Sequence, residues 1–279
     1  MPVKRIRGVD LVYEVVGHSG PWVTLTPGGR RGIMAEHALA SLIAEAGFRV
    51  LLHDRRNVGA SGIALAGDNE SLAQAEDLHG LLQALDAGPA YVCGCSSGAR
   101  MSLLLALHHP DAVKALLLWR VTGGPYAARR LAWNYYEQFL EAAAQGGIEA
   151  VCQTEHFAAM IQANPVNRET LLGMGVEKFV AGMQRWLAGF NKDSGNPVAG
   201  ITPDELRRMT LPAIIIPGND LVHPRAPGQA AHRLLPNSTY REILSDDVDV
   251  DVDFSGWEAK TGTLAAAFID FLRERERDG

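Results

Sequence analysis

Short apolar runs alternate with segments of helical periodicity along the first 122 residues of the chain. Runs typical of strands lie at Leu11–Gly17, Trp22–Gly29, Phe48–Arg56, Ala90–Cys95 and Val113–Val121. Helical spacing of apolar residues occurs between them, over Met34–Gly47, over Ser71–Gly88 with Ser71 as the expected cap, and from Ser96 to Pro110. This alternation predicts an α/β fold with a mostly parallel central sheet flanked by helices.

The pattern changes from Gly123 to Met209, where aromatic and Ala-rich helical segments follow one another without a convincing strand. Alternation then resumes with an expected strand, a helix, a strand and a final helix, at 211–220, 227–236, 238–244 and 256–277. We therefore expect an α/β core formed by residues 1–122 and 210–279. The intervening residues 123–209 are predicted to form an inserted, all-helical cap.

Composition narrows the function classes. Apolar residues make up 47% of the chain and charged residues 21%, which suits a soluble protein with a sizeable core. The formal net charge is −6 with scattered Lys and Arg, so we expect neither nucleic acid nor an anionic membrane as partner. No apolar run reaches the ~18 residues of a membrane span, and the basic N-terminus passes directly into strand-like alternation. Three cysteines form neither a disulfide framework nor a zinc pattern, so a cytoplasmic location is expected.

The segment "YVCGCSSGAR" places Gly94, Ser96 and Gly98 in the pattern G-x-S-x-G between a predicted strand and a predicted helix. A serine on such a sharp turn projects its hydroxyl clear of the sheet, and the two glycines allow strand, turn and helix to approach closely. The helix N-terminus supplies free N–H groups where an oxyanion would form. The pattern indicates a nucleophile, although a serine that only caps the helix would also fit it.

With this turn, three further motifs resemble the α/β-hydrolase superfamily over nearly the whole chain: "TPGG" at 26–29, "HDRRNVGASG" at 53–62 and "IIPGNDLVHP" at 215–224. The resemblance implies Ser96 as nucleophile and Asp220 as the acid that orients the base. It also implies an oxyanion hole made of the backbone N–H groups of Gly29 and Ser97. Asp54 is expected to support its own loop through the adjacent arginines. Neither a cofactor nor a metal is implied.

The sequence departs from the family in the position of the catalytic base. The family carries a histidine in the loop after the last strand, but residues 245–260, "SDDVDVDVDFSGWEAK", contain none. His223, three residues after Asp220, is the candidate base, although it could instead brace the loop before Pro224. A serine hydroxyl is a weak nucleophile without such a base.

Three other accounts of the missing histidine stay open. Asp249 or Asp251 could act as base if its pKa were raised far above 4. Asp249, Asp251 and Asp253 could bind a metal, although they match only the opening of a calcium loop. The protein could also have lost hydrolysis. Independently of these accounts, the alternation of Asp and Val favours a short, solvated strand.

The expected function is that of a serine hydrolase acting on a small or medium apolar ester or related carbonyl compound. In the cap, four aromatic residues are predicted to line the substrate pocket, although some could only pack helices together: Trp133, Tyr136, Phe139 and Trp186. The alternatives are a cofactor-independent lyase or C–C bond hydrolase on the same fold, and a non-catalytic ligand-binding protein. A small-molecule substrate is the expected partner, and self-association into a homo-oligomer is left open.

Overall fold

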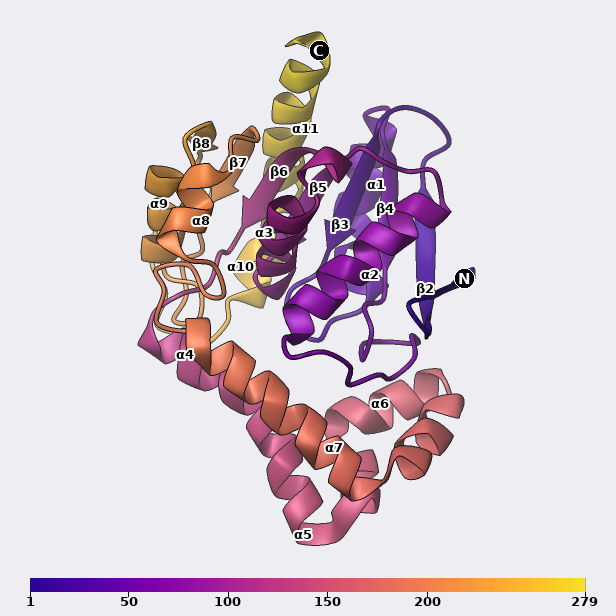
Figure 1. Cartoon of the computed structure of the whole chain (residues 1–279). Helices are drawn as coiled ribbons and strands as arrows, with labels where there is room; N and C mark the ends of the chain where they lie inside the picture. Colours follow the sequence, from indigo (N-terminus) through magenta and orange to yellow (C-terminus); the bar gives the residue numbers. More distant parts are fainter. Residues whose placement is uncertain (279) are drawn as a thin grey trace.

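Within residues 1–278, the part of the chain that our computed structural model describes, a single sheet has the strand order β1-β2-β4-β3-β5-β6-β7-β8 (Figure 1). Its strands are β1 (Val3–Ile6), β2 (Val9–Val16), β3 (Trp22–Thr26), β4 (Arg49–His53), β5 (Ala90–Cys95), β6 (Val113–Trp119), β7 (Ala213–Ile216) and β8 (Ser238–Tyr240). Only β2 runs antiparallel to its neighbours β1 and β4, and the other neighbouring strands pair in parallel. The predicted α/β fold with a mostly parallel sheet is confirmed.

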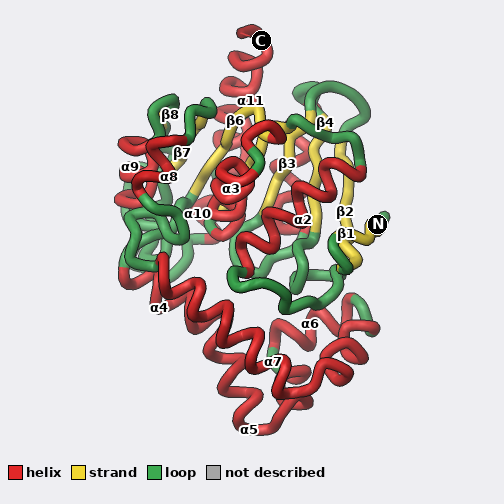
Figure 2. The backbone as a smooth tube through the Cα atoms, viewed as in Figure 1, coloured by secondary structure: helices red, strands yellow, loops and turns green. Residues whose placement is uncertain are grey.

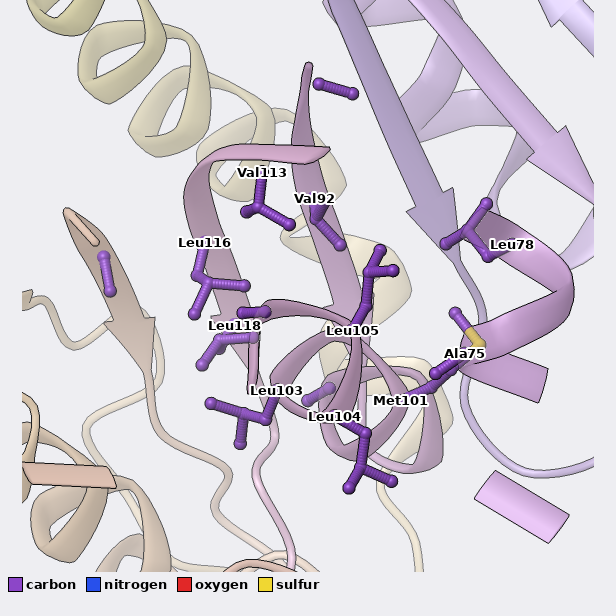
Figure 3. Close-up of a cluster of buried hydrophobic side chains, with 14 of the residues drawn as sticks. Ala75, Leu78, Val92, Met101, Leu103, Leu104, Leu105, Val113, Leu116 and Leu118 are labelled. Carbon is purple, nitrogen blue, oxygen red and sulfur yellow. The ribbon is translucent and has the colours of Figure 1, made fainter. Parts of the chain in front are cut away.

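Helices cover both faces of this sheet, which is why the six residues of β5 are all buried. One face packs against α2 (Glu70–Ala84), α3 (Ser97–His108), α8 (Pro203–Arg208) and α9 (Arg225–Leu234). The other packs against α1 (His37–Glu45), α10 (Phe254–Ala259) and α11 (Thr261–Asp278). Figure 2 shows α2 and α3 in front of the strands, and Figure 3 shows α3 side chains such as Leu105 packed toward Val92 of β5 and Leu116 of β6.

Three details differ from the sequence predictions. The cap of α2 is Asn69, whose side chain accepts a hydrogen bond from Leu72 N, and not Ser71. The expected last helix is divided into α10 and α11 at Lys260. The Asp-Val repeat forms no strand, because its backbone bonds only to the loop after β7: Val248 N donates to Asn219 O.

The chain between β6 and β7 is helical, and Figure 1 shows most of it as one group beyond an end of the sheet. It comprises α4 (Pro125–Ala132), the π-helical turn η3 (Trp133–Glu137), α5 (Gln138–Gln153), α6 (Glu155–Ala163) and α7 (Val166–Asp193), followed by α8. Two short 3-10 helices, η1 (Ile33–Glu36) and η2 (Pro110–Ala112), lie elsewhere in the chain. None of the helices in residues 1–278 is both long and apolar enough to cross a membrane.

The predicted end of the insert at residue 209 falls inside a segment that packs on the sheet. Val198, Ile201, Leu206 and Met209 belong to the same buried cluster as α3 and β6. Helical periodicity cannot show which hydrophobic core a helix joins, so the pattern placed α8 with the insert. Helices α4 to α7 instead share another buried cluster, which also includes Ile63, Leu65 and Val222 of the α/β core, so we propose that the insert ends with α7.

The turn at Ser96 is strained and tightly enclosed by backbone. Ser96 has φ 54° and ψ −111°, a conformation that non-glycine residues rarely adopt. A Cβ on Gly94 would lie 2.4 Å from the backbone of Gly98, and a Cβ on Gly98 would lie 2.3 Å from Thr26 O. The two glycines therefore let β5, α3 and β3 meet directly through backbone atoms.

We expect Gly94→Ala to lower the free energy of unfolding by about 1–3 kcal/mol, because the new methyl group meets rigid backbone. Gly173→Ala is the matched control: Gly173 is exposed in α7 with no atom within 4 Å of the added Cβ. The control should be neutral or stabilising by up to ~1 kcal/mol. Urea unfolding followed by circular dichroism measures both, and equal stabilities of the two variants would contradict the tight packing.

Candidate active site

The carboxyl ends of four parallel strands meet at one edge of the sheet, beside the helical insert (Figure 1). Gly29 follows β3, Ser96 follows β5, and Arg120 follows β6. Asp220 and His223 both lie in the loop after β7. Such an edge is where open α/β sheets commonly bind ligands.

Ser96, His223 and Asp220 form one buried hydrogen-bonded chain. His223 Nε2 lies 2.9 Å from Ser96 Oγ, and His223 Nδ1 lies 2.7 Å from Asp220 Oδ1. Because an ionised carboxylate only accepts, Nδ1 carries the proton and Nε2 is left to accept from the serine hydroxyl. The residues that the sequence proposed as nucleophile, base and acid are thus in direct contact.

Four donors surround the Asp220 carboxylate. Oδ1 accepts from His223 Nδ1 and, at 2.8 Å, from His223 N. Oδ2 accepts from Arg120 Nη2 at 2.6 Å and from Asp253 N at 3.0 Å. Burial alone raises the pKa of Asp220, but the hydrogen bond and charge of His223 and the charge of Arg120 outweigh it. The net pKa is well below the ordinary value, so the carboxylate stays ionised.

Burial lowers the pKa of His223, and the positive charge of Arg120 lowers it further, while Asp220 acts in the opposite direction. Arg120 Nη2 lies 3.3 Å from His223 Nδ1, close enough to disfavour an imidazolium. The net pKa lies below the ordinary 6.5, so His223 is neutral at pH 7 and can accept a proton. Arg120 was not among the residues predicted from the sequence, because its contact with Asp220 depends on β6 lying beside β7 in the sheet.

Ser97 and Gly29 carry the two backbone N–H groups that the sequence proposed as an oxyanion hole. Ser97 is the first residue of α3, so its N–H has no partner within the helix. Gly29 has φ +57°, and its carbonyl accepts from Arg55 Nη2 at 2.6 Å and from Ser97 Oγ at 3.1 Å. Arg55 Nη1 also donates to Ser97 Oγ at 3.0 Å, so one buried guanidinium ties together the two segments expected to bind an oxyanion.

Asp54 supports its loop differently from the expectation. It accepts from the backbone N–H groups of Ile33 and Ala60, at 2.8 and 2.9 Å, and not from its neighbouring arginines. Arg56 instead pairs with Asp77 at 2.6 Å. The structure thus gives Asp54 a place in loop packing, away from the serine.

A cavity of about 300 Å³ opens at Ser96 and His223, at the small end of the range for ligand pockets. Its wall also includes residues from the loops and from α4, η3, α5 and α6: Gly28, Gly29, Arg30, Arg31, Cys95, Arg120, Arg130, Leu131, Asn134, Tyr135, Gln138, His156, Val222, Val252 and Phe254.

The four aromatic residues predicted to line the pocket do not do so. Tyr136, Phe139 and Trp186 are buried in the core of the insert itself, and Trp133 is 43% exposed outside the cavity. Aromatic side chains of helices pack against other helices as well as against cavities, so residue type alone did not identify the cavity wall. Tyr135 stands in the wall instead.

The aspartate repeat takes no part in the serine contact. Asp251 accepts from the Tyr126 hydroxyl and from Arg130 Nε, and Asp253 Oδ1 accepts from Gly256 N at the start of α10. Within residues 1–278, no three His, Cys, Asp or Glu side chains gather as a metal site.

Residues 21–153 match the family model of the α/β hydrolase fold. An uncharacterized hydrolase of Bacillus subtilis is 32% identical over 114 residues, covering 40% of this chain and 41% of that protein. Zearalenone hydrolase of Bionectria ochroleuca is 36% identical over 111 residues, covering 39% of this chain and 42% of that protein. The matched segments thus span about two fifths of these curated relatives.

The crystal structure of the enol-lactonase from Burkholderia xenovorans LB400 superimposes with a TM-score of 0.66 at 20% identity, covering 98% of this chain and 100% of that one. This likeness concerns the fold. Together these findings show the class of fold: the chain has the α/β-hydrolase fold, and residues 21–153 match the family model of that fold.

We expect Arg120→Met to raise the pKa of His223. The change removes a positive charge 3.3 Å from Nδ1 and so makes the imidazolium easier to form. NMR titration of the imidazole protons should find the wild-type pKa below 6.5 and the variant pKa above the wild-type value. Arg129→Met, on an exposed residue of α4, should leave it unchanged. An unchanged or lowered pKa in Arg120→Met would contradict this electrostatic role.

Proposed function

We propose that the protein is a serine hydrolase that cleaves a small ester or a related carbonyl compound through Ser96. The observation that carries the proposal is the 2.9 Å contact between His223 Nε2 and Ser96 Oγ, with Asp220 on the opposite ring nitrogen. The names zearalenone hydrolase and enol-lactonase, borne by a relative and a structural neighbour, are consistent with a hydrolytic reaction.

The proposed reaction uses these groups in sequence. Ser96 Oγ attacks the carbonyl carbon while His223 Nε2 takes its proton, and Asp220 stabilises the imidazolium that forms. The oxyanion accepts hydrogen bonds from Gly29 N and Ser97 N. His223 then gives its proton to the leaving oxygen, and a water molecule, activated by the same histidine, releases the acyl group from Ser96.

The same geometry bears on the alternatives. A non-catalytic binding protein was attractive because the expected histidine is absent, but a neutral, buried His223 against Ser96 supplies the missing base. Asp251 is disfavoured as the base, because its carboxylate already accepts hydrogen bonds from Tyr126 and Arg130. A lyase or C–C bond hydrolase could use the same three residues, and only its substrate would distinguish it.

We expect Ser96→Ala and His223→Ala each to lower kcat for 4-nitrophenyl butyrate by roughly 10⁴- to 10⁶-fold, because triad members act as a unit. As the pH is lowered, wild-type kcat/KM should decrease with an apparent pKa below 6.5, because protonated His223 cannot accept the serine proton. A fluorophosphonate probe should label the wild type and fail to label Ser96→Ala.

Asp249→Asn is the control, because Asp249 is exposed and was the rival base. Its rate should stay within about twofold of the wild type. Full activity in His223→Ala, or loss of activity in Asp249→Asn, would refute His223 as base. No labelling and no Ser96-dependent turnover would refute the serine hydrolase.

A further inference from the structure

Four arginines stand in the wall of the cavity, and no Asp or Glu stands there with them: Arg30, Arg31, Arg120 and Arg130. An arginine stays charged at any physiological pH, so each needs a compensating group nearby. The position of the carboxylates that neutralise these arginines determines which ligands the cavity can bind.

Three of the four arginines are paired with carboxylates that lie outside the cavity wall. Arg30 pairs with Glu70 at 2.9 Å, Arg120 with Asp220 at 2.6 Å and Arg130 with Asp251 at 2.8 Å. These guanidinium groups are each close to neutralised by one negative charge. They add positive potential but leave no full charge unmatched.

Arg31 is different. Its nearest carboxylate is Glu36, at 4.0 Å, with no hydrogen bond recorded between them among the described residues. Burial raises the pKa of Glu36 to about 7 in spite of the positive charges of Arg31 and Arg120, so near pH 7 this carboxyl is partly protonated. The side chain of Arg31 is 37% exposed, and its guanidinium lies 5.0 Å from the ring centre of Phe254, another residue of the wall.

This arrangement disfavours a wholly apolar substrate. Hydrocarbon that filled the cavity would remove water from the Arg31 guanidinium without replacing its hydrogen bonds, which is costly. A carboxylate would restore both the charge balance and the hydrogen bonds, because a guanidinium matches a carboxylate in a two-point contact. One poorly compensated cation matches one negative charge, which favours a monoanionic group over a dianionic phosphate.

We propose that the substrate carries a carboxylate, which Arg31 binds while the reacting carbonyl lies at Ser96. This inference rests on the proposed serine hydrolase function. Arg31 follows the oxyanion-loop residue Gly29 by two positions, and both border the same cavity as Ser96. One small molecule can therefore carry both functional groups.

The test compares 4-nitrophenyl butyrate with mono-4-nitrophenyl succinate. The acyl chain ends in a methyl group in the butyrate and in a carboxylate in the succinate. Wild-type kcat/KM should favour the succinate, after subtraction of the spontaneous rate measured with Ser96→Ala. Arg31→Gln should lower the succinate-to-butyrate ratio by roughly 10-fold or more, because a charge-assisted contact is lost. Arg31→Lys should keep part of the preference, since it retains the charge.

Arg129→Gln is the matched control, because Arg129 is exposed on α4 and absent from the cavity wall. Its ratio should equal that of the wild type. Calorimetry with glutarate gives a second measurement that needs no turnover: Arg31→Gln should weaken binding of this diacid by about 10-fold or more. Thermal unfolding of each variant verifies that it is folded.

The outcomes separate the two proposals. Ser96-dependent butyrate hydrolysis with a succinate-to-butyrate ratio that Arg31→Gln leaves unchanged would overturn the carboxylate site and leave the serine hydrolase standing. Absence of turnover together with Arg31-dependent glutarate binding would overturn the hydrolase and support the carboxylate site. Absence of both would overturn both.

Discussion

The buried carboxylate of Asp220 is the group on which the geometry of this site depends. Burying a charge is costly unless hydrogen bonds replace its hydration, and here each oxygen accepts two. The donors come from three separate segments: Arg120 at the end of β6, His223 in the loop after β7 and Asp253 before α10. One carboxylate therefore holds three loops together and fixes the imidazole. In the proposed mechanism the base is therefore oriented before any substrate arrives.

Local sequence patterns predicted the parts of this molecule that depend on local geometry. The strand, the turn at Ser96 and the following helix are specified within ten residues, and Asp220 and His223 stand three residues apart on one loop. Arg120 could not be found in this way, because its importance comes from β6 lying beside β7 in the sheet. The prediction that aromatic residues of the insert line the pocket was wrong for a related reason. Periodicity identifies a helix with an apolar face, but only tertiary packing decides whether that face meets another helix or a cavity.

Net charge and local charge lead to different expectations about ligands. The chain as a whole carries −6, yet the cavity wall holds four arginines, of which three pair with carboxylates outside the wall and Arg31 does not pair closely. In a low-dielectric cavity the nearest charges dominate, since distant surface charges are screened by solvent and salt. Composition therefore describes how the protein meets large polyanions such as nucleic acid, whereas the pairing of individual arginines determines which small molecule fits beside Ser96.

The proposed mechanism places the base and its acid on one loop, which changes what the loop after β8 has to supply. That loop then needs no catalytic side chain, and Val252 in the loop and Phe254 at the start of α10 form cavity wall instead. It still contributes to the site through backbone, because Asp253 N donates to Asp220 and Leu221 N donates to Val250 O. Backbone donors do not depend on side-chain identity, so side chains in this loop can vary to suit a substrate while the acid keeps its partner. In the proposed mechanism the shape of the pocket is thus separate from the proton chemistry, whose acid and base both stand in the loop after β7.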